Sequence, residues 1–214
     1  IRAARNNVAS TDIFIYAFDD QGIVRDQLHQ RMKFEIATAG EKLKAGGVKY
    51  YGTLHLQPGK YAVKTLVRVG ESDKKAYRRI DVNVPAAGDV AVLQPFFFAE
   101  AGEWVMVKGD SRLQGTTPYP FILNGQSFIP AARATLRKGE PRQFTVWVWN
   151  AKPDELSWEI APEAKLVSET ESSTMAKFVF ELPDVPANTS ELGVTIRKKD
   201  SNDERRVVLP VRVQ

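Results

Sequence analysis

Alternation of apolar and polar residues with a period of two is the feature that most constrains this chain. Residues 61–69 place Tyr61, Val63, Thr65, Val67 and Val69 on one face, and residues 11–18 and 77–84 alternate in the same way. β-Branched and aromatic residues at this spacing are typical of half-buried strands. Only residues 25–32 and 38–46 could hold a helical turn, so we predict an all-β protein.

Short turns separate the alternating runs. The turn signals are DDQG at 19–22, AGG at 45–47, QPGK at 57–60 and GESDKK at 70–75. Strands joined in this way, with no amphipathic helix between them, favour an antiparallel sandwich. Residues 121–128 predict a tight hairpin, because Asn124-Gly125 can adopt the positive φ angles of a type I′ turn.

Two stretches of the chain share one layout. Residues 48–84 and 174–213 each run strand, turn, strand, charged break, strand. Each would form the last three strands of a sandwich, so we predict two consecutive immunoglobulin-like antiparallel β-sandwich domains. The first covers residues 1–86, and the second covers residues 87–214 with a long hairpin-containing insertion near 109–130.

The turn at the start of residues 59–69 has the composition of a structural corner. Pro58 fixes φ and Gly59 supplies a positive φ. Tyr61 follows at the distance from which a tyrosine hydroxyl can reach back to the upstream backbone in Greek-key sandwiches. We therefore interpret Pro58, Gly59 and Tyr61 as a corner and not as a binding site.

Two tryptophans are the strongest candidates for a binding surface. In residues 144–150, Trp147 and Trp149 share one face while Phe144, Val146 and Val148 share the other. We expect the tryptophan face to be buried by the neighbouring domain or by the 109–130 segment. The alternative is an exposed pair that binds a sugar or another protein.

No catalytic or metal-binding signature is present. The chain has no cysteine, and His29 and His55 stand apart without a nucleophile motif beside either. The acidic clusters at 19–20 and 200–203 lack the glycine and the spaced glutamate of an EF-hand, and are predicted to be turns. We expect no enzyme activity, no cofactor and no bound metal.

The distribution of charge argues against a nucleic-acid-binding protein, and the hydropathy argues against a membrane-spanning helix. The 30 basic and 26 acidic residues are scattered, and the longest basic run is 197–199, which is typical of solvated strand faces and not of a nucleic-acid surface. No stretch approaches the ~20 apolar residues of a membrane helix. Because the chain begins at Ile1, we expect it to be a piece of a longer protein.

Four segments together resemble a known family. They are residues 12–36, 47–69, 84–109 and 118–150, which include GVKYYGTLHLQPGKYAVKTLVRV and PYPFILNGQSFIPAARATLRKGEPRQFTVWVWN. They are similar to the region downstream of the von Willebrand factor A domain in bacterial VWFA-related proteins, notably of Acidobacteria. The resemblance covers most of residues 11–150. It implies an extracytoplasmic protein, which is periplasmic, surface-bound or secreted.

The same resemblance places a metal-dependent adhesion site in the A domain, in a D-x-S-x-S loop. That loop does not occur in this chain, so no metal ligand is carried over. We therefore expect a non-catalytic structural and protein-interaction module of an exported protein, with a protein as its partner. The alternative is carbohydrate binding on Trp104, Trp147, Trp149 or Trp158. The remaining rival, a hydrolase, needs converging His, Asp and Ser side chains.

Overall fold

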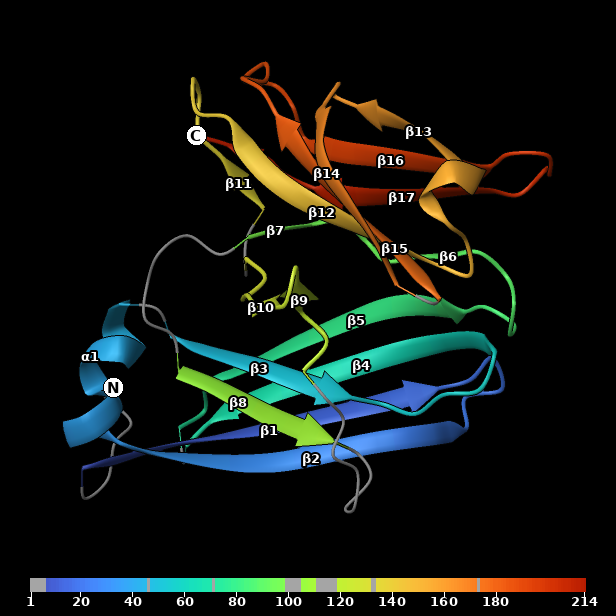
Figure 1. Ribbon diagram of the computed structural model, residues 1–214. Coiled ribbons are helices and arrows are strands. Elements are labelled where there is room, and N and C mark those ends of the chain that lie inside the picture. Colours follow the sequence, from blue (N-terminus) through green and yellow to red (C-terminus); the bar gives the residue numbers. More distant parts are fainter. Residues whose placement is uncertain are drawn as a thin grey trace. The chain divides into compact units, whose positions relative to one another are not determined.

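The computed structural model describes residues 7–45, 47–70, 72–98, 105–110, 119–131, 134–172 and 174–214. Strands dominate these residues, and the helices among them are one α-helix and one 3-10 turn. The predicted all-β class with antiparallel sheets is confirmed (Figure 1). The chain divides into two compact units, Ile1–Ala86 with Ala101–Pro118, and Ala87–Glu100 with Tyr119–Gln214.

The first unit is built on a four-stranded antiparallel sheet. Its strand order is β2 (Val24–Glu35), β1 (Val8–Phe18), β4 (Gly59–Val69) and β5 (Lys75–Val84). In β2, Leu28, Met32 and Phe34 are buried, whereas the odd-numbered residues from 25 to 35 are exposed. This period of two explains why residues 25–32 lie in a strand and not in the helical turn that the sequence allowed.

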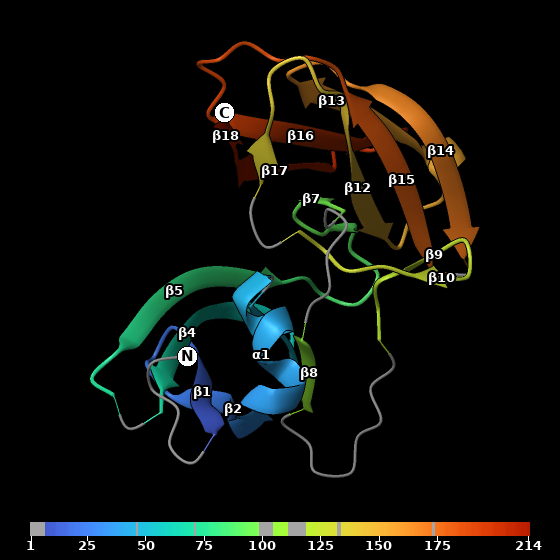
Figure 2. The ribbon, with the colours of Figure 1, turned by 90° about the vertical axis from the view of Figure 1, so that its left-hand side faces the viewer.

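A second layer covers one face of this sheet. It consists of α1 (Ile36–Ala45), inside which most of the predicted helical stretch falls, and the parallel pair β3 (Val48–Thr53) and β8 (Val105–Asp110). Ile13, Met32 and Phe34 form a core with Leu43 and Val107. Figure 2 shows the sheet curving around α1 and β8. No helix among the described residues is long and apolar enough to cross a bilayer.

Strand β8 joins the first unit, although the sequence places these residues in the second domain. It pairs with β3 from Val48–Val105 to Thr53–Asp110. Gly109 lies against the Tyr50 ring, so close that a side chain there would overlap the tyrosine hydroxyl. A parallel partner comes from far away in the sequence, so no local pattern predicts that β8 pairs with β3.

The second unit has two antiparallel sheets. The first sheet runs β14 (Lys165–Ser172), β15 (Met175–Leu182), β12 (Arg142–Trp149) and β6 (Ala91–Val92), and β7 (Phe96–Phe97) also pairs with β12. The second sheet runs β13 (Leu156–Ala161), β16 (Glu191–Lys198) and β17 (Glu204–Pro210). The 3-10 turn η1 (Pro153–Glu155) joins β12 to β13. In addition, β11 (Thr135–Leu136) pairs in parallel with β18 (Arg212–Val213).

This strand order is that of an immunoglobulin domain. With β6 and β7 as strand A, the two sheets read D-E-B-A and C-F-G, as in constant-type immunoglobulin sandwiches. Trp158 on β13, the equivalent of strand C, packs against Phe178 and Phe180 with ring centroids 5.1 and 5.7 Å apart. Both phenylalanines are fully buried, and burial of each such side chain stabilises a fold by roughly 1.5–3 kcal/mol.

The predicted hairpin is also confirmed. Strands β9 (Ile122–Leu123) and β10 (Gln126–Ser127) pair in antiparallel fashion. Asn124 and Gly125 between them have φ angles of 50° and 76°. These values are the positive φ angles that a type I′ turn requires at both central positions.

Candidate binding face

One face of the first unit's sheet has no second layer among the described residues of that unit. Side chains alternate along a strand, and the antiparallel register brings the same set of positions to this face. We call it the open face. Its residues are Ser10, Asp12, Phe14, Tyr16, Phe18, Gln27, His29, Arg31, Lys33, Ala62, Lys64, Leu66, Arg68, Lys75, Tyr77, Arg79 and Asp81. The other face holds the core.

A charged row crosses the open face. Asp12 stands opposite Arg31 on one side and Arg68 on the other, and Lys75 is the next residue beyond Arg68. Arg31 donates to the two Asp12 carboxylate oxygens at 2.7 and 3.2 Å, and Arg68 donates at 3.0 Å. Asp12 is 2% exposed, whereas the Arg31 and Arg68 side chains are 57% and 49% exposed. The carboxylate therefore lies beneath two arginines that face water.

The arginines fix the charge of this carboxylate. The hydrogen bond from Arg31 lowers the pKa of Asp12 most, burial opposes it, and Arg68 adds to the lowering. The pKa of Asp12 falls from 3.8 to about 2. Asp12 is therefore ionised throughout the physiological pH range.

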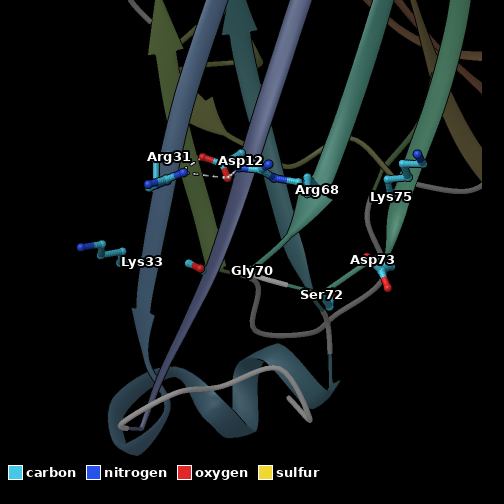
Figure 3. A pocket seen from close by; sticks show the side chains of 9 residues that line it. Asp12, Arg31, Lys33, Arg68, Gly70, Ser72, Asp73 and Lys75 are labelled. Atoms are coloured by element: carbon cyan, nitrogen blue, oxygen red, sulfur yellow. Dashed lines mark hydrogen bonds and ion pairs between the residues drawn. The ribbon is translucent and has the colours of Figure 1, made fainter.

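An open cavity of about 810 Å³ surrounds this charged row. Figure 3 shows Arg31 and Arg68 reaching Asp12 from opposite sides. The lining residues are Ser10, Asp12, Arg31, Lys33, Arg68, Gly70, Ser72, Asp73 and Lys75. Four of these side chains are basic and two are acidic. Lys33 and Lys75 make no ion pair with any described residue. The cavity is thus positively charged.

An apolar groove adjoins the cavity on the same face. It has a volume of about 290 Å³ and is lined by Phe14, Tyr16, Phe18, Lys64, Leu66 and Tyr77. Tyr77 is 63% exposed. Asp12 and Phe14 are two residues apart on β1, which separates the charged row from the aromatic row by about 7 Å. One extended ligand could therefore contact both.

Two of the groove's rings already carry a neighbour. The His29 ring stacks on Phe14 with centroids 4.2 Å apart and planes 7° apart. The Lys64 ammonium lies 4.2 Å from the centroid of Phe18. These contacts leave less ring surface for a flat ligand to stack upon.

The structure places the two histidines differently. His29 Nε2 lies 3.7 Å from an Asp12 oxygen, and the His55 backbone N–H donates to Asp26 at 2.6 Å. Among the described residues, no hydroxyl or amine hydrogen-bonds the His29 ring, so a hydrolase-like His, Asp and Ser set is not assembled there. No group of three metal-ligating side chains gathers within the part of the chain that is described.

The tryptophan pair does not form an exposed platform. Trp147 is 2% exposed, and its indole N–H donates to the Thr145 hydroxyl at 3.0 Å. Phe96, Phe121 and Phe128 pack around its ring with centroids 5.4 to 6.3 Å away. Trp147 is therefore a core residue, as expected, because Phe121 and Phe128 of the 109–130 segment cover it, and the alternative of an exposed binding surface at Trp147 is wrong.

Trp149 and Trp158 are both partly buried. Trp149 is half-buried, with its ring 6.3 Å from that of Trp147. Trp158 packs on the core of the second unit. Trp104 lies outside the described residues.

The residues of the predicted corner and of the two acidic clusters lie in turns of the fold. The Tyr61 hydroxyl donates to the Gln57 carbonyl at 2.8 Å, and Gly59 after Pro58 has a φ of 151°. The Asp19 carboxylate accepts the backbone N–H groups of residues 21 and 23 at 3.0 and 2.8 Å, as a turn aspartate does. Asp200, with a φ of 60°, lies in the turn between β16 and β17.

Sequence reasoning missed Asp12, Arg31 and Arg68. The alternation of residues 11–18 separates the two faces correctly, but it does not say which residues stand opposite Asp12. An aspartate inside a strand is an uncommon choice, and this was the available signal. The register of β1 with β2 and with β4 brings Arg31 and Arg68 beside Asp12.

Comparison with known protein families and with characterised proteins finds no match. Among solved structures, the crystal structure of Dpr2 Ig1–Ig2 in complex with DIP-Theta Ig1–Ig3 matches with 6% identity and a TM-score of 0.32. It covers 96% of this chain and 54% of the other. An endo-fucoidan hydrolase of glycoside hydrolase family 107 matches with 9% identity and a TM-score of 0.24, and covers 74% of this chain and 19% of the other.

This chain therefore spans about half the length of the first structure and about a fifth of the second. Both TM-scores are below 0.5, so neither similarity carries an argument about function. The immunoglobulin-like assignment rests on the strand order of the second unit.

Proposed function

We propose that this chain is a non-catalytic protein-interaction module, and that the open face of its first unit is the docking surface. The observation that carries the proposal is a sheet face with no second layer among the described residues of its own unit, on which a positively charged cavity adjoins an apolar groove. Exposed apolar surface beside concentrated charge is typical of interaction sites.

The partner that fits this surface is a protein segment with acidic and apolar side chains. Carboxylates complement the cavity around Arg31 and Arg68, and apolar side chains fit the groove beside Leu66 and Tyr77. Stacking of a sugar ring or a base needs free ring faces. His29 and Lys64 cover part of two rings, which favours a protein over a glycan or a nucleic acid.

The resemblance of residues 11–150 to VWFA-related proteins supports a wider setting for this module. In that setting the chain is a β-sheet extension of an exported bacterial protein, and it presents the open face outside the cytoplasm. A gene that encodes a D-x-S-x-S A domain upstream of Ile1 would support this setting. A cytoplasmic catalytic domain at that position would contradict it.

Calorimetric titration with a random glutamate–tyrosine copolymer tests the docking surface. Tyr77→Ser removes an exposed ring of the groove, and we expect it to weaken binding about tenfold. The matched control is Ile80→Ser, which removes an apolar side chain that is 46% exposed on the opposite face of β5. We expect this control to bind as the original protein does.

Polygalacturonate and single-stranded DNA serve as competing polyanions in the same assay. Preferential binding of the copolymer supports a protein partner. Equal affinity for all three, with the same salt dependence, would show only non-specific charge attraction. Tighter binding of either competitor would overturn the choice of a protein partner.

A further inference from the structure

Asp12 is an unusual residue for the sheet that contains it. Aspartate is disfavoured within strands, and covering a carboxylate incurs a desolvation penalty, which the two arginine partners offset here. On a face without a second layer, threonine or valine would satisfy the strand equally well. An ionised side chain at this position therefore suggests a task beyond folding, and its two arginine partners indicate which one.

We infer that the cavity around Asp12 is an oxyanion-binding site, in which Arg31 and Arg68 contact the ligand and Asp12 is a positioning residue. The ligand group is a carboxylate. This inference rests on the proposed function, because it names the chemistry with which the open face would hold an acidic segment.

The hydrogen bonds of the two arginines support this assignment. A guanidinium group carries five N–H donors in a planar fork. Arg31 uses Nε and Nη2 on Asp12, and Arg68 uses Nη2 alone. The remaining donors include a full edge of Arg68, and both side chains are about half exposed at the cavity. Such an edge matches the two oxygens of a carboxylate.

Asp12 would act by limiting the freedom of both side chains. An unpaired arginine on a strand samples many rotamers, and ordering it on binding costs affinity. Here the Asp12 carboxylate on β1 holds the guanidinium groups of Arg31 on β2 and Arg68 on β4, the two strands that flank β1, as Figure 3 shows. Lys33 and Lys75, which also line the cavity, keep the site positive after Asp12 has neutralised one arginine.

Sodium acetate titration followed by NMR tests the site directly. We expect saturable shifts of the Arg31 and Arg68 Nε–H signals, with sodium chloride at equal ionic strength as the reference. Arg79 is the internal control, because it lies on the same face, pairs with Asp81 and does not line this cavity. Its signal should follow chloride and acetate alike.

A pair of variants separates positioning from simple neutralisation. Asp12→Asn and Asp81→Asn each remove one negative charge from the same face. We expect Asp12→Asn to weaken acetate binding about tenfold, because the arginines lose their charged anchor. Asp81→Asn should leave binding unchanged or strengthen it slightly. Circular dichroism and backbone shifts establish that both variants are folded.

The outcomes are distinct. Absence of saturable shifts at Arg31 and Arg68 would overturn the oxyanion site. Tighter acetate binding by Asp12→Asn would show that Asp12 only neutralises charge, which overturns its positioning role. Neither result depends on the copolymer or on Tyr77, so failure of this site is distinguishable from failure of the docking surface.

Discussion

At the scale of single residues, Asp12 links the sheet to its candidate site. It is almost fully buried, yet it lies on the open face, where it accepts hydrogen bonds from Arg31 and Arg68 and has His29 Nε2 3.7 Å away. The carboxylate is therefore both a structural anion and the centre of a surface cluster.

The lowered pKa of Asp12 predicts an acid-sensitive contribution to stability. Its pKa in the folded chain, about 2, lies below the ordinary value of 3.8. A depressed pKa stabilises the fold above the ordinary value, and this contribution is lost as the pH falls from about 4 to about 2. Urea unfolding across this range should show a steeper loss for the original protein than for Asp12→Asn. Identical slopes would contradict the ion-pair assignment.

The Tyr61 corner gives a second prediction at this scale. Tyr61→Phe removes the hydroxyl that donates to Gln57 and should lower the free energy of unfolding by about 1 kcal/mol. Chemical denaturation measures the change. Tyr77→Phe is the control, because the Tyr77 side chain is largely exposed. If both variants lose the same stability, the corner contributes nothing specific.

At the scale of elements, the β9–β10 hairpin shows how a short motif supports a core. Phe121 and Phe128 flank the hairpin and pack on Trp147. The Lys177 ammonium lies 4.2 Å from the Trp147 ring centroid and donates to the Ile122 carbonyl, which joins β15 to the hairpin. The tryptophan strand is thus covered within its own unit.

A glycine substitution tests the hairpin geometry. Gly125→Ala meets open space but forces a side chain into a φ of 76°, so it should destabilise the second unit by about 1 kcal/mol. Gly193→Ala is the control, since its added carbon meets the nearest backbone oxygen at an ordinary 3.8 Å. Thermal unfolding followed by near-ultraviolet circular dichroism compares the two. Equal tolerance at both sites would argue against the positive φ.

At the scale of the whole molecule, each unit is built from two separate stretches of the sequence, which alternate along the chain. The first unit includes β8, while the preceding strands β6 and β7 belong to the second. Val107 of β8 packs on the core of the first unit. A cut after residue 86 would therefore remove part of that core.

Gly109→Ala tests, in the intact chain, whether β8 belongs to the first unit. The added carbon overlaps the Tyr50 hydroxyl and would lie 2.6 Å from Gln30 Oε1, so both side chains must shift and their 3.1 Å hydrogen bond is disturbed. We expect the first unit to lose about 1–3 kcal/mol, because overpacking is destabilising. Hydrogen exchange read by strand should show faster exchange in β3 and in neighbouring β2. Protection lost only in the second unit would contradict the placement of β8.

Local patterns in the sequence predicted much of this fold and little of its candidate site. Alternation and turn residues predicted the strands, and Asn124-Gly125 predicted the hairpin, because both signals are local. The pairing of β3 with β8 and the meeting of Asp12 with Arg68 are long-range. They depend on register and parallel pairing, which composition does not encode. Trp147 is ambiguous for a different reason, because both faces of its strand are apolar and the alternation does not say which face is covered.

The most direct test of the docking surface is chemical-shift mapping with the glutamate–tyrosine copolymer on the intact chain. We predict that the largest changes fall on open-face residues of β1, β2, β4 and β5, centred on Arg31, Arg68 and Tyr77. Changes concentrated instead in the second unit, or spread evenly over all exposed lysines and arginines, would contradict the assignment of the open face as the binding surface.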